Sequence, residues 1–138
     1  MFDVASLTVG HELEPFSRLT DLAVWNRYAA VNDEYVPIHM DDEAGRAAGL
    51  PGAIGMGNLQ WAYLHNLVRQ WIGEQGRVVK MACQFRNLNL RGQTVTARGR
   101  VTGVDRGPDG TDVDLEVWTE DQDGNKLAPG TCTVRLDG

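Results

Sequence analysis

The sequence predicts an α+β protein in which an antiparallel sheet wraps around one long helix. Three observations support this prediction. Apolar residues recur at helical spacing over residues 58–72, four later segments alternate between apolar and polar residues, and turn-forming sequences separate those segments. Residues 1–75 read as loops and helices, and the remainder reads as strands and turns. One long buried helix and an antiparallel meander pack as two layers.

The length of 138 residues and the ordinary composition predict one globular domain over residues 1–138. Hydrophobic residues make up 42% of the chain and charged residues 23%. There are 13 Lys and Arg residues against 19 Asp and Glu residues, so the net charge is −6. This acidic balance argues against a general nucleic-acid binder and against binding to an anionic membrane surface.

Residues that cap or break helices predict three helices in the first half of the chain. Residues 20–29 start with the capping pair Thr-Asp and continue with amphipathic spacing. Pro37 prevents helix in the following stretch, and the acids Asp41–Glu43 then open a short helix that Gly49 ends. The long helix from about Asn58 to Ile72 has an apolar arc wider than one stripe, so we expect it to be largely buried.

Four alternating segments predict half-buried antiparallel strands. In the first of them one face is expected to consist of Val79, Met81, Cys83 and Phe85. The other three segments fall within residues 94–101, 112–117 and 131–136. Residues 107–110 and 121–125 contain Gly, Pro, Asp and Asn, which are typical of the turns between strands.

The two cysteines, Cys83 and Cys132, lie far apart and form no ligand cluster with the three histidines. A zinc site and a disulfide framework are therefore not expected, and a reducing compartment is the simpler interpretation. Residues 1–15 lack the basic and apolar regions of a signal peptide. No apolar run approaches the ~20 residues that a membrane helix needs. We therefore expect a cytoplasmic protein.

A carboxylate and an imidazole lie five residues apart, at Glu34 and His39. Pro37 between them forces its predecessor to be extended, which leaves both side chains free to turn toward one point. A carboxylate beside a neutral imidazole can hold a water molecule, take its proton and return it elsewhere. Taken alone, a single Glu and a single His in an acidic loop are more often surface residues.

This segment resembles the signature of the MaoC-like dehydratases, which are also called (R)-specific enoyl-CoA hydratases. The family pattern is roughly Ser-Gly-Asp-x-Asn-Pro-(Ile/Leu)-His, and the Pro-Ile-His of residues 37–39 aligns with its end. Residues 44–52 match the family's short helix and its Ala-Gly-Leu-Pro-Gly ending, and residues 55–57 fall on its Ala-His-Gly. The resemblance is specific in order and spacing over residues 28–60.

The resemblance implies a hot-dog fold, in which the sheet wraps the long helix, and a dimer with its pockets between subunits. It implies the reversible addition of water to a trans-2-enoyl-CoA, giving an (R)-3-hydroxyacyl-CoA, with no metal or redox cofactor. Glu34 and His39 would activate the water, and the Gly57 N–H would bind the thioester oxygen as negative charge develops on it. Neighbouring residues are expected to contact the substrate: Asp33, Tyr35, Met56 and Asn58.

Four positions depart from the family pattern. Glu34 stands in place of Asp, and the family's Gly, Asn and His are replaced by Asp33, Val36 and Met56. Some family members work as heteromers, in which one subunit supplies the catalytic pair and the other mainly the acyl pocket. A non-catalytic or half-catalytic subunit therefore stays open as an alternative. An acyl-CoA thioesterase is a further alternative, since fold alone does not settle function.

Coenzyme A carries phosphates, and the basic residues of this chain concentrate in residues 77–106. That stretch holds seven of the 13 Lys and Arg residues against a single acid, Asp105. We expect Arg86 and Arg91, near the end of a strand, to contact phosphate. Arg98 and Arg100 are expected to solvate the outer face of the sheet. The expected partners are an acyl-CoA and either a second copy of the chain or another hot-dog subunit.

Overall fold

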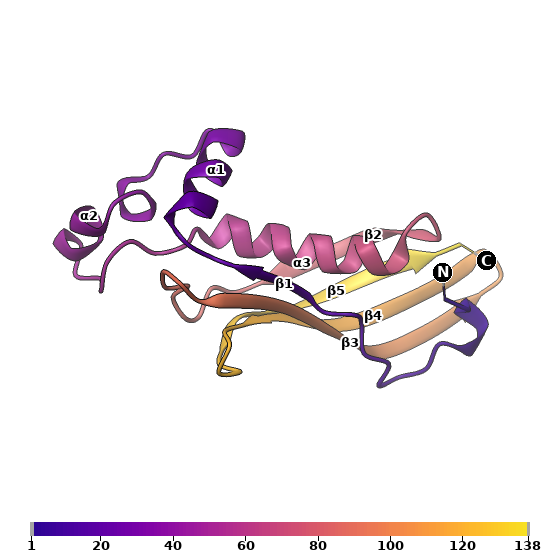
Figure 1. The fold of residues 1–138 in the computed structure, drawn as a ribbon. Helices are drawn as coiled ribbons and strands as arrows, with labels where there is room; N and C mark the ends of the chain where they lie inside the picture. Colours follow the sequence, from indigo (N-terminus) through magenta and orange to yellow (C-terminus); the bar gives the residue numbers. More distant parts are fainter. Residues whose placement is uncertain (1, 138) are drawn as a thin grey trace.

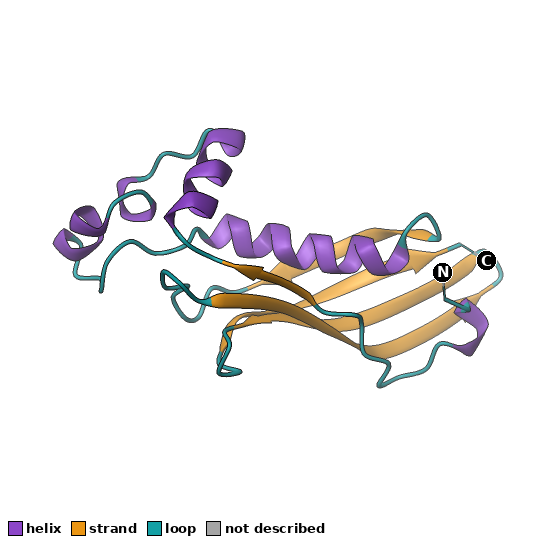
Figure 2. Cartoon of the chain, viewed as in Figure 1, coloured by secondary structure: helices purple, strands orange, loops and turns teal. Residues whose placement is uncertain are grey.

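The computed structural model describes residues 2–137 as a curled antiparallel sheet around one long helix, which confirms the predicted α+β class. The five strands run in the order β1-β3-β4-β5-β2 (Figures 1 and 2). Their bounds are β1 Phe16–Leu19, β2 Gly76–Cys83, β3 Thr94–Gly107, β4 Gly110–Glu120 and β5 Lys126–Leu136. The helical elements are η1 Val4–Ser6, α1 Leu22–Asn32, η2 Pro37–His39, α2 Asp42–Ala47 and α3 Gly57–Ile72.

The core lies between α3 and the inner face of the sheet. Every second residue of β4, and of β3 from Val95 to Val101, points inward and is buried, as the alternation predicts. Helix α3 buries residues over more than one stripe of its surface, in agreement with its wide apolar arc. The packed side chains include Leu64, Leu67, Val68, Val95, Val101, Leu115 and Val117.

Charged pairs cover the outer face of the sheet. Arg100 donates to Glu116 at 2.7 Å, and Arg98 pairs with Glu120. These pairs join β3 to β4 and agree with the expectation that both arginines solvate this face. Each exposed pair contributes little to stability, and the paired charges keep the face polar.

Helices α1 and α2 form an arm at the end of the molecule where α3 begins (Figure 1). The predicted start of the first helix is confirmed, because the Asp21 side chain caps α1 by accepting from Val24 N at 3.0 Å. Gly49 follows α2 with a φ of +83°, a left-handed conformation in which glycine avoids the steric cost of a side chain.

Two features of the sheet differ from expectation. Strand β1, Phe16–Leu19, lies in a region where the sequence indicated only loops and helices. The inner face of β2 is also different, because the register shifts between Val78 and Lys80. The shift leaves Val79 57% exposed, and Phe85, which lies beyond the end of the strand, is 54% exposed. Of the four residues expected on one face, Met81 and Cys83 are the two that pack against the core.

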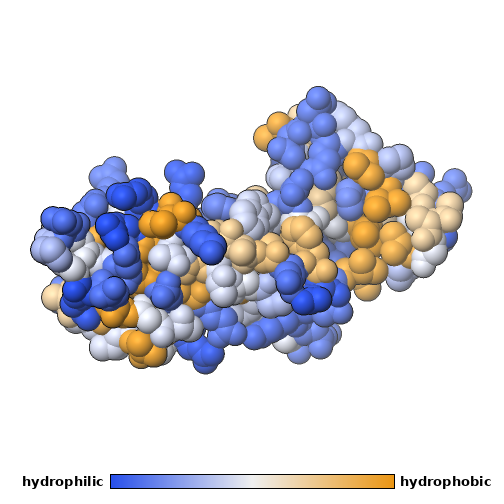
Figure 3. Space-filling model, turned by 180° about the vertical axis from the view of Figure 1, so that it is seen from behind, coloured by the Kyte–Doolittle hydropathy of each residue, from blue (hydrophilic) through white to orange (hydrophobic). Residues whose placement is uncertain are grey.

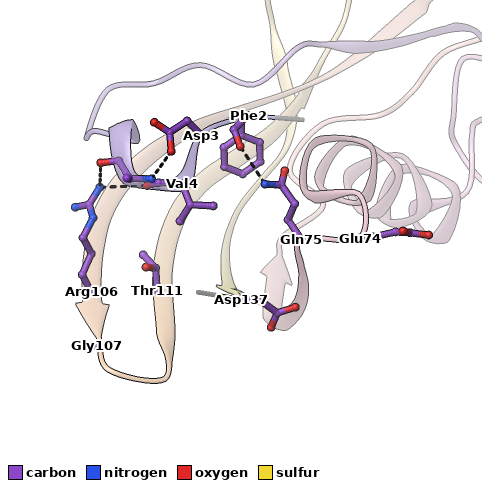
Figure 4. A pocket seen from close by; sticks show the side chains of 10 residues that line it. Phe2, Asp3, Val4, Glu74, Gln75, Arg106, Gly107, Thr111 and Asp137 are labelled. Carbon is purple, nitrogen blue, oxygen red and sulfur yellow. Dashed lines mark hydrogen bonds between the residues drawn. The ribbon is translucent and has the colours of Figure 1, made fainter.

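The N-terminal segment is fastened to the end of the molecule opposite the arm, beside a cavity of about 640 Å³ (Figure 4). Gln75 donates to the Phe2 carbonyl at 3.0 Å. The Arg106 guanidinium donates at 2.8–3.4 Å to three carbonyls, those of Val4, Ala5 and Leu7. These polar side chains therefore hold the N-terminal segment in place.

Within residues 2–137, no helix has both the length and the apolar character that crossing a membrane requires.

Candidate functional site

Glu34 lies directly after α1, in a turn that the chain makes at Asp33. Asp33 has a φ of +51°, in the left-handed region that Asp adopts more readily than most residues with a side chain. This turn lets the Glu34 N–H donate to the Ala29 carbonyl at 3.0 Å, which satisfies one of the free carbonyls at the helix end. The backbone at Glu34 is thus set by the end of α1.

The Glu34 carboxylate is held through one of its two oxygens. Its Oε2 accepts from Asn32 Nδ2 at 3.1 Å and from Asn58 Nδ2 at 3.2 Å. Its Oε1 has no hydrogen-bond partner among residues 2–137. Burial, and to a smaller extent the negative charge of Glu34, raise the pKa of Tyr28. The phenol of Tyr28 is therefore neutral and close enough to Glu34 to sense the charge of its carboxylate.

His39 lies at the end of η2, where its ring is oriented by a backbone carbonyl. Its Nδ1 lies 2.8 Å from the Ile54 oxygen. Because a carbonyl only accepts, Nδ1 carries the hydrogen, and Nε2 of the neutral ring is the atom with a free lone pair. The Ile54 N–H in turn donates to the Ile38 carbonyl at 3.0 Å, so Ile54 holds η2 through both of its backbone polar groups.

Gly57 opens α3 without a side-chain cap. The preceding residue, Met56, is in extended conformation and makes no capping hydrogen bond through its side chain. No acceptor among residues 2–137 binds the Gly57 N–H, which is one of the unsatisfied donors of a helix start. The positive end of the helix dipole adds to the attraction of this amide for negative charge.

These groups converge on one short segment, residues 54–58. His39 is bound to the first residue of the segment and Glu34 to the last, and the free amide of Gly57 lies between those two attachment points in sequence. The segment itself is fixed from a third side, because Gly55 N donates to the Asn89 carbonyl at 2.8 Å. Glu34, His39 and Gly57 thus share a common support. The hydrogen bonds that provide it link residues 15 and 24 positions apart.

The aromatic ring of Phe85 lies against Gly57. A Cβ added to Gly57 would lie 2.7–2.9 Å from three carbons of that ring, closer than real contacts allow. Phe85 is half exposed, so its ring has room to move toward solvent. We expect Gly57→Ala to lower the free energy of unfolding by about 1 kcal/mol, because the ring must be displaced. Thermal or urea unfolding of the variant measures this loss.

The double variant Gly57→Ala/Phe85→Ala isolates the contact between the two residues. Removing the ring takes away the three atoms nearest to the added methyl group, and the Gly57→Ala substitution should then cost much less than it does with Phe85 present. Equal costs in the two backgrounds would show that the ring is not what limits the space at Gly57.

Asp42 fastens α2 to the segment that leads to Ile54. Its Oδ1 accepts from Ala53 N at 3.0 Å, and its Oδ2 from Arg91 at 2.8 Å. The Ala53 hydrogen bond is the main cause that lowers the pKa of Asp42, and Arg91 and Arg46 add to it. Arg91, expected to contact phosphate, is therefore engaged with α2.

Stability is expected to depend on pH through Asp42. The pKa of Asp42 is lower in the folded chain than its ordinary value of 3.8, so its stabilising effect is complete above that value. The effect is lost as the pH falls toward the folded pKa. We expect Asp42→Asn to make the decline in unfolding free energy between about pH 5 and about pH 3 shallower. Urea titrations across this range measure it.

Arg91→Gln should retain most of this decline, because the hydrogen bond from Ala53, the larger cause of the lowered pKa of Asp42, remains. An unchanged slope in Asp42→Asn would contradict the prediction.

The remaining expected site residues have different surroundings. Met56 is fully buried in the core, and Arg86 is exposed and donates to the Gln84 side chain. Tyr35 is exposed beside Glu34, as are Val31 and Val36. Figure 3 shows apolar residues gathered over the end of the molecule that the arm forms. An apolar surface therefore adjoins the Glu34 turn.

Comparison with known proteins agrees with this fold. Among solved structures, an (R)-hydratase from A. caviae involved in PHA biosynthesis is 23% identical, with a TM-score of 0.84 over 95% of this chain and 98% of the other. The ChsH1-ChsH2 complex from Mycobacterium tuberculosis matches at 18% identity and a TM-score of 0.83, over 94% of this chain and 98% of the other. The unliganded R-hydratase PhaJ1 from Pseudomonas aeruginosa matches at 17% identity and a TM-score of 0.85, over 97% and 84%.

These likenesses confirm the hot-dog fold. No curated protein sequence matches the chain. The family model described as the MaoC like domain matches residues 8–122, most of the chain. The chain therefore belongs to the MaoC-like domain family.

Proposed function

We propose that this protein is a hydro-lyase that adds water reversibly to a trans-2-enoyl-CoA, giving an (R)-3-hydroxyacyl-CoA. One observation carries the proposal: an acid–base pair, Glu34 and His39, is fastened to the segment that presents the free Gly57 amide. Membership of the MaoC-like family supports it, as does the fold shared with the (R)-hydratase from A. caviae.

In the proposed reaction, a water molecule is held between the Glu34 carboxylate and the His39 ring. The pair accepts a proton from the water as its oxygen bonds to the β-carbon of the substrate. The electron pair of the double bond moves toward the thioester carbonyl, and the Gly57 N–H stabilises the negative charge on that oxygen. A proton from the pair then bonds to the α-carbon. The pair ends in its starting state, so the chemistry needs no metal or redox cofactor.

The two members of the pair suit these tasks in different ways. The His39 hydrogen bond to Ile54 fixes the ring and leaves Nε2 as the proton acceptor. Glu34 has one oxygen held by amides and one open oxygen.

A second subunit is part of the proposal. The ChsH1-ChsH2 structure, which shares this fold, is a complex of two chains. The apolar side chains exposed beside Glu34 suit an acyl chain or a partner surface. We propose a homodimer, or a heteromer with another hot-dog chain that completes the acyl pocket. In the heteromer this chain is either the catalytic or the supporting subunit. Arg86, exposed in the segment that follows β2, is the arginine proposed to contact phosphate.

The test is absorbance-monitored hydration of a panel of enoyl-CoAs, from short chains to bulky ring-bearing ones, by the purified chain. Loss of the double-bond absorbance together with formation of the (R)-3-hydroxy product supports the proposal. Activity that requires a second hot-dog chain identifies the heteromer. Release of free thiol with the double bond intact would contradict hydration and indicate a thioesterase.

A further inference from the structure

Asn58 connects the Glu34 carboxylate to α3. Two side-chain amides bind Glu34 Oε2. One belongs to Asn32, the last residue of α1, which lies two residues before Glu34. Asn58 lies 24 residues after Glu34, in the first turn of α3. The Asn32 contact is local, so it does not determine where the carboxylate lies relative to α3. The Asn58 contact at 3.2 Å does.

The position of Asn58 links Glu34 to the Gly57 amide. Asn58 follows Gly57 directly, and consecutive Cα atoms lie about 3.8 Å apart in a rigid peptide geometry. A carboxylate bound to Asn58 is therefore held by the residue next to the one that carries the Gly57 N–H. Binding through Oε2 leaves Oε1 open for another partner.

We propose that Asn58 is a positioning residue, which sets the open Glu34 oxygen relative to the Gly57 amide and does not itself contact substrate. The inference rests on the proposed hydratase function. It replaces the expectation from sequence that Asn58 contacts the substrate. A displacement of about 1 Å in a reacting group costs on the order of 100-fold in rate. A residue such as Asn58, which sets the position of the Glu34 oxygen, therefore has a large effect on the rate.

The contact is matched to the length of glutamate. Aspartate is shorter by one methylene, so its oxygen would lie about 1.5 Å further from Asn58, the length of a C–C bond. At that separation the amide no longer donates a hydrogen bond. An effect of Asn58 that acts through Glu34 must therefore disappear when Glu34 is shortened.

The test is a double-mutant cycle of Asn58→Ala and Glu34→Asp, with kcat and KM measured on an enoyl-CoA that the wild type hydrates. We expect Asn58→Ala to lower kcat roughly tenfold with KM little changed, because the lost hydrogen bond is to a charged group. In the Glu34→Asp background, Asn58→Ala should change kcat by less than about twofold. Asn66→Ala is the matched control, since Asn66 is also an exposed asparagine on α3.

Three results would overturn the inference while the proposed function stands. These are an unchanged kcat in Asn58→Ala, equal losses in the two backgrounds, and a rise in KM with kcat unchanged, which would indicate substrate contact. A wild type that hydrates no enoyl-CoA, alone or with a second hot-dog chain, overturns the proposed function and this inference with it. Thermal unfolding of each variant separates these outcomes from loss of the fold.

Discussion

We expect Glu34→Gln and His39→Asn each to lower the rate of enoyl-CoA hydration by about 100- to 10,000-fold, the usual contribution of a general acid–base group. Glutamine retains the size of glutamate and the oxygen that accepts from Asn58, but its amide does not exchange protons. Asparagine at position 39 retains a donor for the Ile54 carbonyl and loses the Nε2 lone pair. Both variants should unfold at temperatures close to that of the wild type.

Two further substitutions separate the proposed catalytic role of His39 from its contribution to stability. His39→Ala removes the Nε2 atom together with the donor to Ile54, so it should lose activity and also some stability. His11→Asn changes an exposed histidine beside Trp71, near the other end of α3, and should retain full activity. Rates are measured by the loss of enoyl absorbance, and stability by thermal unfolding. Turnover of Glu34→Gln and His39→Asn within about threefold of the wild type would remove the pair from the mechanism.

Gly45→Ala is expected to be the most destabilising single methyl addition in the arm. A Cβ at Gly45 would lie 1.9 Å from the Gly52 oxygen and 2.9 Å from the Ala53 nitrogen, both backbone atoms. A backbone clash cannot be relieved by a side-chain rotation, so α2 must move away from residues 52–53. The movement breaks the Asp42–Ala53 hydrogen bond and displaces Ile54, which orients His39. We expect a loss of about 3 kcal/mol in unfolding free energy and a marked loss of hydration.

Gly49→Ala is the matched control, because Gly49 lies just after the end of the same helix. A Cβ at Gly49 would meet no atom within 4 Å, so only its left-handed backbone is strained. The cost of that strain is about 1 kcal/mol, and activity should persist. Urea unfolding and hydration assays compare the two variants. The account of the α2 contact is refuted if Gly45→Ala is as stable as Gly49→Ala.

The elements that were predictable are those with a strong local signal. Asp21 and Gly49 mark helix ends through capping and left-handed geometry, and both effects depend only on neighbouring residues. Strand β1 was missed because it is four residues long and only Phe16 is half-buried, so it shows no alternation. The face of β2 was assigned incorrectly because one register shift moves Val79 to the solvent side.

The site was predictable only as a set of residue types. The motif placed Glu34, His39 and Gly57 in order along the chain, and the resemblance assigned their roles. The hydrogen bonds that orient these groups come from residues distant in sequence, Ile54 and Asn58. No pattern of local spacing encodes such contacts, because they form only when α1, η2 and α3 have packed together.

The fastening of the N-terminal segment has a practical consequence. Residues 2 and 137 both lie at the end of the sheet away from α1 and α2 (Figure 1). An affinity handle or surface linkage joined to either end of the chain would emerge about as far from the Glu34 turn as the molecule permits. Immobilised protein should therefore keep the end that carries the Glu34 turn open to ligands, which suits surface-based binding measurements.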